Sequence, residues 1–269
     1  MKVFISADIE GIWGVVSKKQ IIGDSFDYNR GRKLMTEEVN LACEALIENG
    51  ATEIVVNDSH GPMDNLFIEK LHPKVQLISG SPKPLSMMQG IEKGYDKALF
   101  IGYHSRAGSS FSTFDHTYNS SLLSSVKLNG QPVGEAGMNA RLAAYYSTAV
   151  VFVSGDQTLA GQVKEEIGDI PTLAVKHSIN RTSAHNISFE QLKEGYKEKI
   201  KEAARCEAKP LKLEGPFVLE VEFLTSQGPT LAERIPTVTK VGDKTVEIRN
   251  DDFLELFKTL NAALDSDSL

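Results

Sequence analysis

Three apolar, strand-like runs of the sequence end in side chains that can bind metal ions. Each run is short and rich in β-prone residues, which is typical of a buried strand. Each passes directly into acids or a histidine. This pattern limits the possible folds, because it favours a sheet whose strands end at one edge. The runs and the groups that follow them are 2–7 with Asp8 and Glu10, 53–57 with Asp58 and His60, and 98–102 with His104.

Strand-like and helix-like segments alternate along most of the chain. Asp27 is a candidate cap for a first helix over 28–49, which Gly50 would end. Repeated βα units predict an α/β fold with a mainly parallel sheet sandwiched by helices. Ligands of such sheets bind outside the carboxyl ends of the strands. Further strands are expected at 75–78, 150–154 and 172–175, and further helices near 66–71 and over 136–146, 157–167 and 188–206.

Two parts of the chain depart from this alternation. Residues 105–121 are rich in Ser, Thr and Gly without a clear period, which predicts a long loop of functional importance. Asn129-Gly130 then predicts a hairpin between 124–128 and 131–133. Beyond Pro210 the sequence favours strands at 217–223, 235–240 and 244–249, before a helix at 251–264. We expect an α/β metal-binding catalytic domain over 1–210 and a smaller strand-rich C-terminal subdomain over 211–269.

Composition excludes several classes of protein. The 29 basic and 36 acidic residues give a net charge of −7 without a basic stripe, which argues against nucleic acid as a partner. The two cysteines, Cys43 and Cys206, form neither a disulfide framework nor a zinc–cysteine site. No secretory leader pattern opens the chain, and no apolar run approaches the ~18 residues of a membrane span. We expect a cytoplasmic protein that does not bind membranes.

Asp8 and Glu10 are separated by one residue, so in a strand both side chains lie on the same face. Two adjacent carboxylates repel each other unless a cation lies between them, although a capping role explains the pair alone equally well. His60 and His104 at equivalent strand ends favour a metal site, and Glu135 is a further acid at a predicted helix start. Such oxygen and imidazole ligands suit zinc, manganese or iron(II), and either one or two ions.

Other polar residues have more ordinary interpretations. Asp58 is expected either to orient a ligand histidine or to form a turn. Arg181 is expected either to bind a substrate carboxylate through its fork of donors or to form an ordinary surface ion pair. Structural roles are predicted for the remaining histidines, which are His72, His177 and His185.

Several motifs together resemble one family, the zinc-dependent D-aminopeptidases of the dipeptide-transport operon type (DppA-like). The similarity runs from residue 1 to about 190 and weakens after about 200. The matching segments are Ser-Ala-Asp-Ile-Glu-Gly (6–11), Asn-Asp-Ser-His (57–60), Gly-Tyr-His (102–104), Gly-Glu-Ala-Gly-Met-Asn-Ala (134–140), and parts of 28–38 and 69–73.

The resemblance implies a dinuclear zinc site, two Zn²⁺ per subunit, with Asp8 as the bridging ligand. It further implies that His116, in the long loop, is an essential residue that does not bind metal. The resemblance also implies that the chain cleaves an N-terminal residue, a D-amino acid such as D-Ala, from short peptides, and that it assembles as stacked rings of identical subunits, a decamer. The ligands implied by the resemblance are Asp8, Glu10, His60, His104 and Glu135.

These features predict a metallo-aminopeptidase in which a metal-activated water attacks the peptide carbonyl. His116 would act as proton shuttle or nucleophile. A dinuclear metal phosphoesterase or another amidohydrolase remains the alternative, since its ligands would be similar. A non-catalytic nucleotide- or sugar-binding module is less favoured, because no Gly-rich phosphate loop is present.

Overall fold

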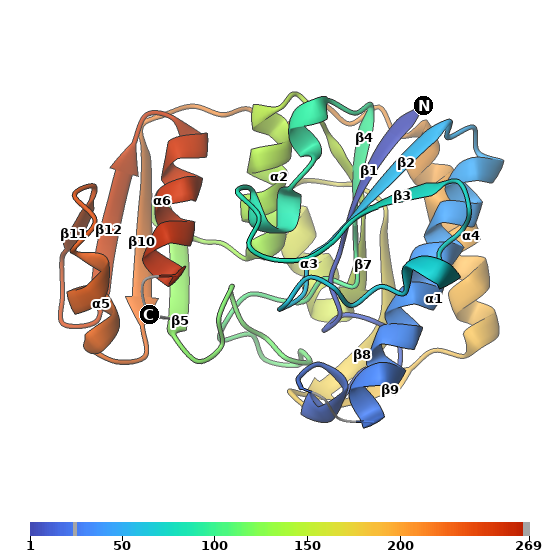
Figure 1. The fold of residues 1–269 in the computed structure, drawn as a ribbon, viewed down its shortest axis with the longest axis horizontal. Coiled ribbons are helices and arrows are strands. Elements are labelled where there is room, and N and C mark those ends of the chain that lie inside the picture. The colour runs from blue at the N-terminus through green and yellow to red at the C-terminus, as the bar shows by residue number, and fades with distance from the viewer. Residues whose placement is uncertain (24–25, 266–269) are drawn as a thin grey trace.

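The computed structural model describes residues 1–23 and 26–265, and these form two sheets with helices packed around them. Residues 266–269, the end of the predicted C-terminal subdomain, lie outside the described part. Figure 1 shows the larger sheet in the middle of the molecule and the smaller one at the left. The predicted fold class, a mainly parallel sheet between helices with an additional strand-rich part, is confirmed.

The larger sheet has seven strands in the order β3-β2-β1-β4-β7-β8-β9. All neighbouring pairs are parallel except β8 and β9, which pair antiparallel. The strands are β1 (Lys2–Ala7), β2 (Glu53–Asp58), β3 (Val75–Ile78), β4 (Lys97–Ile101), β7 (Val150–Asp156), β8 (Thr172–Asn180) and β9 (Ser183–Asn186).

The strand order reverses direction at β1. From β1 the chain adds β2 and β3 on one side, and then returns to add β4, β7 and β8 on the other. The carboxyl ends of β1 and β4 therefore lie at the switch point, where open α/β sheets bind their ligands. Asp8 follows β1 and His104 lies just beyond β4, so the fold brings the predicted site to this position.

Helices cover both faces of this sheet. The helices α1 (Phe26–Glu48) and α4 (Phe189–Arg205) pack together on one face, whereas α2 (Glu135–Tyr145) and α3 (Gln157–Glu166) lie on the other (Figure 1). Alternate side chains of β1 enter the two cores, Val3 and Ile5 on the α1 side and Phe4 on the other. This explains the continuous apolar runs of the sequence, because a sheet covered on both faces needs apolar residues at every position.

The smaller sheet is antiparallel, in the order β11-β12-β10-β5-β6. Helix α6 (Phe253–Asp265) packs between this sheet and α2, so the two sheets share one apolar core (Figure 1). The predicted hairpin joins this sheet as β5 and β6, and the division into domains at residue 210 stays a prediction. The elements are β5 (Leu123–Leu128), β6 (Gln131–Pro132), β10 (Phe217–Phe223), α5 (Gln227–Ala232), β11 (Val238–Lys240) and β12 (Thr245–Asn250).

Some local predictions were wrong. Helix α1 begins at Phe26, so Asp27 lies in its first turn and does not cap it. The predicted strand at 172–175 extends to Asn180, and β9 and α5 were not predicted. The helix expected near 66–71 is one of four short 3₁₀ helices, which cover Lys18–Gln20, Ile68–Lys70, Ser86–Met88 and Ile91–Lys93.

Among residues 1–23 and 26–265, no helix combines the length and apolar character needed to cross a membrane. The cytoplasmic location stays a prediction.

Candidate metal centre and active site

Two glycines allow the loops after β1 and β4 to approach each other closely. The amide of Gly11 donates to the carbonyl of Gly102 at 2.8 Å. A Cβ at Gly11 would overlap the backbone of Gly102 and Tyr103. Gly102 has a φ of +69°, and a Cβ there would overlap the carbonyl of Asp8. Only glycine at both positions lets the acids after β1 lie next to His104.

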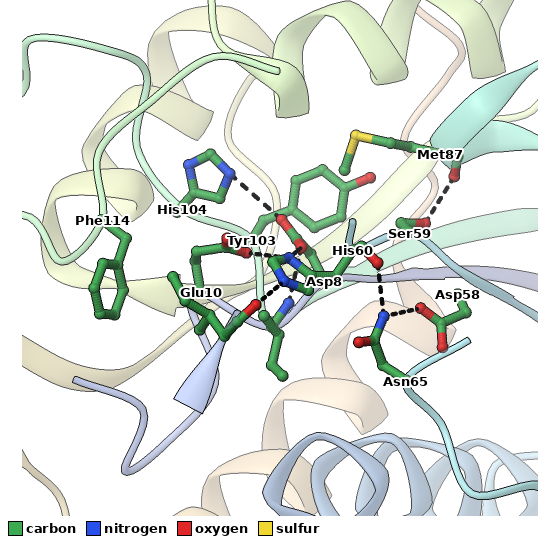
Figure 2. Close-up of polar contacts among 12 residues, drawn as sticks. Asp8, Glu10, Asp58, Ser59, His60, Asn65, Met87, Tyr103, His104 and Phe114 are labelled. Atoms are coloured by element: carbon green, nitrogen blue, oxygen red, sulfur yellow. Dashed lines mark hydrogen bonds and ion pairs between the residues drawn. The ribbon is translucent and has the colours of Figure 1, made fainter. Parts of the chain in front are cut away.

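Asp8 lies between two histidines (Figure 2). Its Oδ1 is 3.3 Å from Nδ1 of His60, and its Oδ2 is 3.4 Å from Nε2 of His104. The amide of Ile9 donates to Oδ1 at 2.8 Å, which fixes the orientation of the carboxylate. One carboxylate therefore faces two imidazoles with different oxygen atoms.

Each histidine faces a second acid as well. Glu10 Oε2 is 2.9 Å from His60 Nδ1, and Glu135 Oε1 is 3.4 Å from His104 Nε2. Glu135 is the first residue of α2, where the helix dipole stabilises a negative charge. All five predicted ligands are brought together, with exposed fractions of 9% or less. The group is Asp8, Glu10, His60, His104 and Glu135.

The outward ring nitrogens of both histidines bind backbone carbonyls. His60 Nε2 lies 2.7 Å from the carbonyl of Ile21, and His104 Nδ1 lies 3.0 Å from the carbonyl of Ser105. A carbonyl only accepts, so each of these nitrogens carries the hydrogen. The inward nitrogens are left to face the carboxylates, which is the arrangement that orients histidine ligands of metals.

The pKa shifts within the cluster show how its negative charges are balanced when no metal ion is bound. Burial disfavours the imidazolium of His60, but the charges of Glu10 and Asp8 outweigh burial and raise its pKa well above the ordinary value. Glu135 and Asp8 likewise outweigh burial and raise the pKa of His104. Burial opposes ionisation of Asp8, yet its close contacts with His104 and His60 lower its pKa. Positive charge must balance the acids, as protons or as metal ions.

Two atoms of the cluster remain without a hydrogen bond among the described residues. They are the buried Glu10 Oε2 and His104 Nε2. The 2.9 Å approach of His60 to Glu10 does not have hydrogen-bond geometry. Buried polar atoms are normally satisfied, so two orphaned ligand atoms at one centre fit a cation site. Their oxygen and imidazole chemistry suits zinc.

The predicted catalytic residue, His116, lies beside this cluster. Its Nε2 is 3.6 Å from Glu135 Oε1, and its ring stacks on that of His104. Its Nδ1 lies 2.8 Å from the carbonyl of Phe114, so Nδ1 carries the hydrogen and Nε2 faces inward. The side chain of His116 is 14% exposed, so it meets both the cluster and the cavity in front of it.

The loop that carries His116 is held by a buried acid. Asp156 accepts hydrogen bonds from the Ser112 hydroxyl at 2.8 Å and the Thr113 amide at 3.1 Å, while it also caps α3. Phe114 and Tyr118, on either side of His116, have φ of 53° and 60°. Non-glycine residues in this region cost about 1–3 kcal/mol each and are common at functional sites. The predicted loop is thus ordered by tertiary contacts.

Sequence reasoning missed a buried cation beneath the site. Lys176, fully buried on β8, donates to the carbonyls of Glu10 at 2.7 Å, Ile12 at 3.0 Å and Val15 at 2.7 Å. Burial lowers its pKa to about 8, against the charges of Asp156 and Glu38. Lys176 therefore fastens the loop that carries Glu10. Its position directly after the predicted strand at 172–175 was the only sequence signal.

The remaining polar candidates lie outside the cluster. Asp58 accepts from Asn65 Nδ2 at 2.8 Å and from the Leu66 amide at 2.7 Å, so it fixes the turn that carries His60 (Figure 2). His72 accepts from an amide in a surface turn. His177 and His185 are cross-strand neighbours on β8 and β9. None of these histidines belongs to the described groups with metal-ligand spacing.

A cavity of about 430 Å³ opens in front of the cluster. Its size is in the range of small-molecule sites. Glu10, His60 and His116 form the part next to the cluster, and Lys18 and Arg181 are also among its lining residues. A buried group of acids and histidines at the bottom of a cavity is the arrangement of a metal-dependent hydrolase.

Comparison with known proteins defines the family. The model of a family described as D-aminopeptidase matches residues 1–262. A curated D-aminopeptidase of Bacillus subtilis (strain 168) is 37% identical over 266 residues, which are 97% of this chain and 95% of that protein. The chain therefore belongs to the D-aminopeptidase family, and the predicted class of enzyme, a peptidase, is confirmed.

A solved structure agrees over the whole chain. It is described as the zinc-dependent D-aminopeptidase DppA from Bacillus subtilis, a self-compartmentalizing protease. The TM-score is 0.95 at 35% sequence identity, and the match covers all of this chain and 98% of that one. The resemblance inferred from the motifs is thus confirmed.

Proposed function

We propose that this protein is a zinc-dependent D-aminopeptidase that removes an N-terminal D-residue, such as D-Ala, from short peptides. Family membership supports the reaction class. The zinc requirement of the Bacillus subtilis structural relative supports the metal. The observation that carries the proposal is the placement of Asp8, whose two carboxylate oxygens face His60 and His104 separately.

In this proposal two zinc ions share Asp8. One ion would be held by Asp8, Glu10 and His60, and the other by Asp8, His104 and Glu135. When bound, the pair would supply Lewis acidity and a water nucleophile that is active near neutral pH. These side chains are buried, so their charges interact in a medium of low dielectric constant, where electrostatic effects are strong.

His116 is assigned the proton transfer. Its Nδ1 hydrogen is held by the carbonyl of Phe114, so Nε2 is the atom that can take up a proton and deliver it to the leaving amine. Nε2 also lies within ligand distance of Glu135 and His104, so geometry alone would allow His116 to bind metal. Proton transfer is preferred because His116 is more exposed than the other five residues and lines the cavity.

The metal assignment is tested by counting zinc in the purified protein. Mass spectrometry of the metal content should give two zinc ions per subunit, and anomalous scattering at the zinc edge should locate both beside Asp8. Asp8→Asn should lower the zinc content, whereas Asp64→Asn, at an exposed acid outside the cavity, should not. At most one tightly bound ion in the native protein would refute the dinuclear assignment.

The reaction is tested with three chromogenic substrates, D-alanyl p-nitroanilide, its L-isomer and p-nitrophenyl phosphate. The D-anilide should be hydrolysed fastest. Hydrolysis of the phosphate ester alone would favour the alternative of a dinuclear phosphoesterase. Preference for the L-isomer would leave an aminopeptidase but contradict its stereochemistry.

We also propose a homo-oligomer of stacked rings, a decamer. The description of the structural relative as a self-compartmentalizing protease supports an assembly that encloses its active sites. Native mass spectrometry of the 29.5 kDa chain should show a particle of ten subunits. A monomer at micromolar concentration would contradict this proposal.

A further inference from the structure

Two cationic side chains line the active-site cavity away from the metal cluster, and one of them, Arg181, pairs with Asp115. Glu10 is the one acid that lines it within the described residues, and Glu10 belongs to the cluster. The other fully charged lining residues are Lys18 and Arg181. Two cations in the cavity of a chain with net charge −7 indicate a ligand whose far end is negative.

Arg181 is held in a fixed orientation at the turn between β8 and β9. Its carbonyl accepts from the Phe114 amide at 3.0 Å. Its Nη1 donates to the carbonyl of Asp115 at 2.7 Å and to Oδ1 of Asp115 at 2.6 Å. The Nε and Nη2 donors make no hydrogen bond with any described residue, and 46% of the side chain is exposed. A preoriented guanidinium with free donors suits a planar carboxylate.

Lys18 belongs to the segment that also supports the cluster. It begins the 3₁₀ helix Lys18–Gln20, which Ser17 and Gln20 stabilise through a capping box. The carbonyl of Ile21, directly after this helix, accepts from His60. Lys18 is exposed, and its amine pairs with no acid in the described part of the chain. Lys18 is thus a second cationic side chain of the cavity, on the segment whose Ile21 carbonyl accepts from His60.

We propose that Arg181 and Lys18 form a subsite for the free C-terminal carboxylate of a short peptide. The inference rests on the proposed function, because only a peptide cut near its amino end would place its carboxylate in this cavity. Arg181 binds the carboxylate through Nε and Nη2, and Lys18 adds a second charge. The enzyme therefore selects short peptides with a free carboxyl terminus over amides.

The test compares two substrates that differ only at the carboxyl terminus, D-Ala-Gly and D-Ala-Gly amide. In the native enzyme, kcat/KM for the free acid should exceed that for the amide by about 10-fold or more, since charge-assisted hydrogen bonds are lost with the amide. Arg181→Lys keeps the charge but removes the fork, and should lower the ratio several-fold, with the remainder due to the two retained charges. Lys18→Gln should reduce the ratio by a smaller factor.

The neighbouring Lys19 supplies the control. Lys19→Gln removes the same charge one residue away, outside the cavity lining, and should leave the ratio unchanged. If Arg181 only supports the Asp115 loop, its variant will slow both substrates equally and keep the ratio, which overturns the inference. Equal rates for acid and amide in the native enzyme would overturn it too, while the proposed function stands. Failure to cleave both peptides and the D-anilide would remove the proposed function and this subsite together.

Discussion

The imidazole rings of His104 and His116 stack almost parallel, with centroids 3.9 Å apart and an interplanar angle of 12°. His104 directs its inner nitrogen to Asp8 and Glu135, whereas His116 meets the cavity. The stack therefore fixes the ring of His116 directly beside the cluster. The same stacking contact holds the loop at 105–121 next to the end of β4.

Replacing His116 with Ala should lower turnover by about 10²-fold or more and leave the zinc content intact, because in the proposed mechanism the ring transfers a proton and does not hold the metal. Steady-state kinetics and metal analysis of the same preparation measure both effects. His72→Ala, in a surface turn, is the matched control and should retain activity. Loss of zinc from the His116 variant would make it a ligand, and full activity would remove it from the mechanism.

Metal-free protein should lose thermal stability as the pH rises above neutral. His60 and His104 have raised pKa values in the folded state, so their contribution is fully present below about pH 6.5, the pKa of an unfolded histidine. It is lost as the pH rises through the folded values. Melting curves of metal-free protein from pH 6 to 9 measure the trend.

With zinc present, the thermal stability of the protein should no longer fall as the pH rises, but should increase. Binding replaces the histidine protons, so zinc affinity should increase with pH and protons should be released. Calorimetry in buffers of different ionisation enthalpy counts those protons. A zinc affinity independent of pH would contradict the protonated state of the metal-free cluster.

Substitution of Gly11 with Ala should destabilise the metal-free protein strongly, by roughly 2–4 kcal/mol, since the new methyl group must displace the backbone of Gly102 and Tyr103. The variant should also bind zinc more weakly, because the loops after β1 and β4 move apart. Urea unfolding gives the free energy. Gly161→Ala is the control, at an exposed position inside α3 with open space around it, and should stabilise by about 0.5–1 kcal/mol.

Lys176→Met should cost about 2–4 kcal/mol of unfolding free energy, because three carbonyls of the Glu10 loop lose their buried donor. Zinc affinity should fall as well, since Glu10 becomes less well positioned. Competition with a chelator measures the affinity. Lys197→Met changes an exposed lysine of α4 and should have little effect on either quantity. Unchanged zinc affinity in the Lys176 variant would limit that residue to stability.

The sequence predicted the strands and the meeting of their ends because both depend on local patterns. Apolar runs such as 2–7 and 98–102 signal strands buried on both faces, and parallel strands end at a common edge. That edge brought Asp8 and His104 together. Glu135 was found through the resemblance and its place at a helix start, since nothing local links α2 to β1.

The missed features depend on tertiary contacts. Lys176 lies one residue beyond the predicted strand at 172–175, and only the carbonyls of a distant loop make its burial in β8 tolerable. Strand β9 is short and polar, and it pairs with β8 at the edge of the sheet, so it has no apolar signal. Asp27 was predicted as a cap because acids are common there, but an acid in the first turn gains from the same helix dipole.

The scattered origin of the candidate ligands has a consequence for biosynthesis. Residue 8 is made early, whereas residue 135 emerges only after half of the chain has been synthesised, and the five candidate ligands come from the ends of three strands and the start of one helix. A nascent or truncated polypeptide that ends before α2 lacks Glu135, one of the proposed ligands. The proposed site is therefore complete only in a chain that has been synthesised past the start of α2.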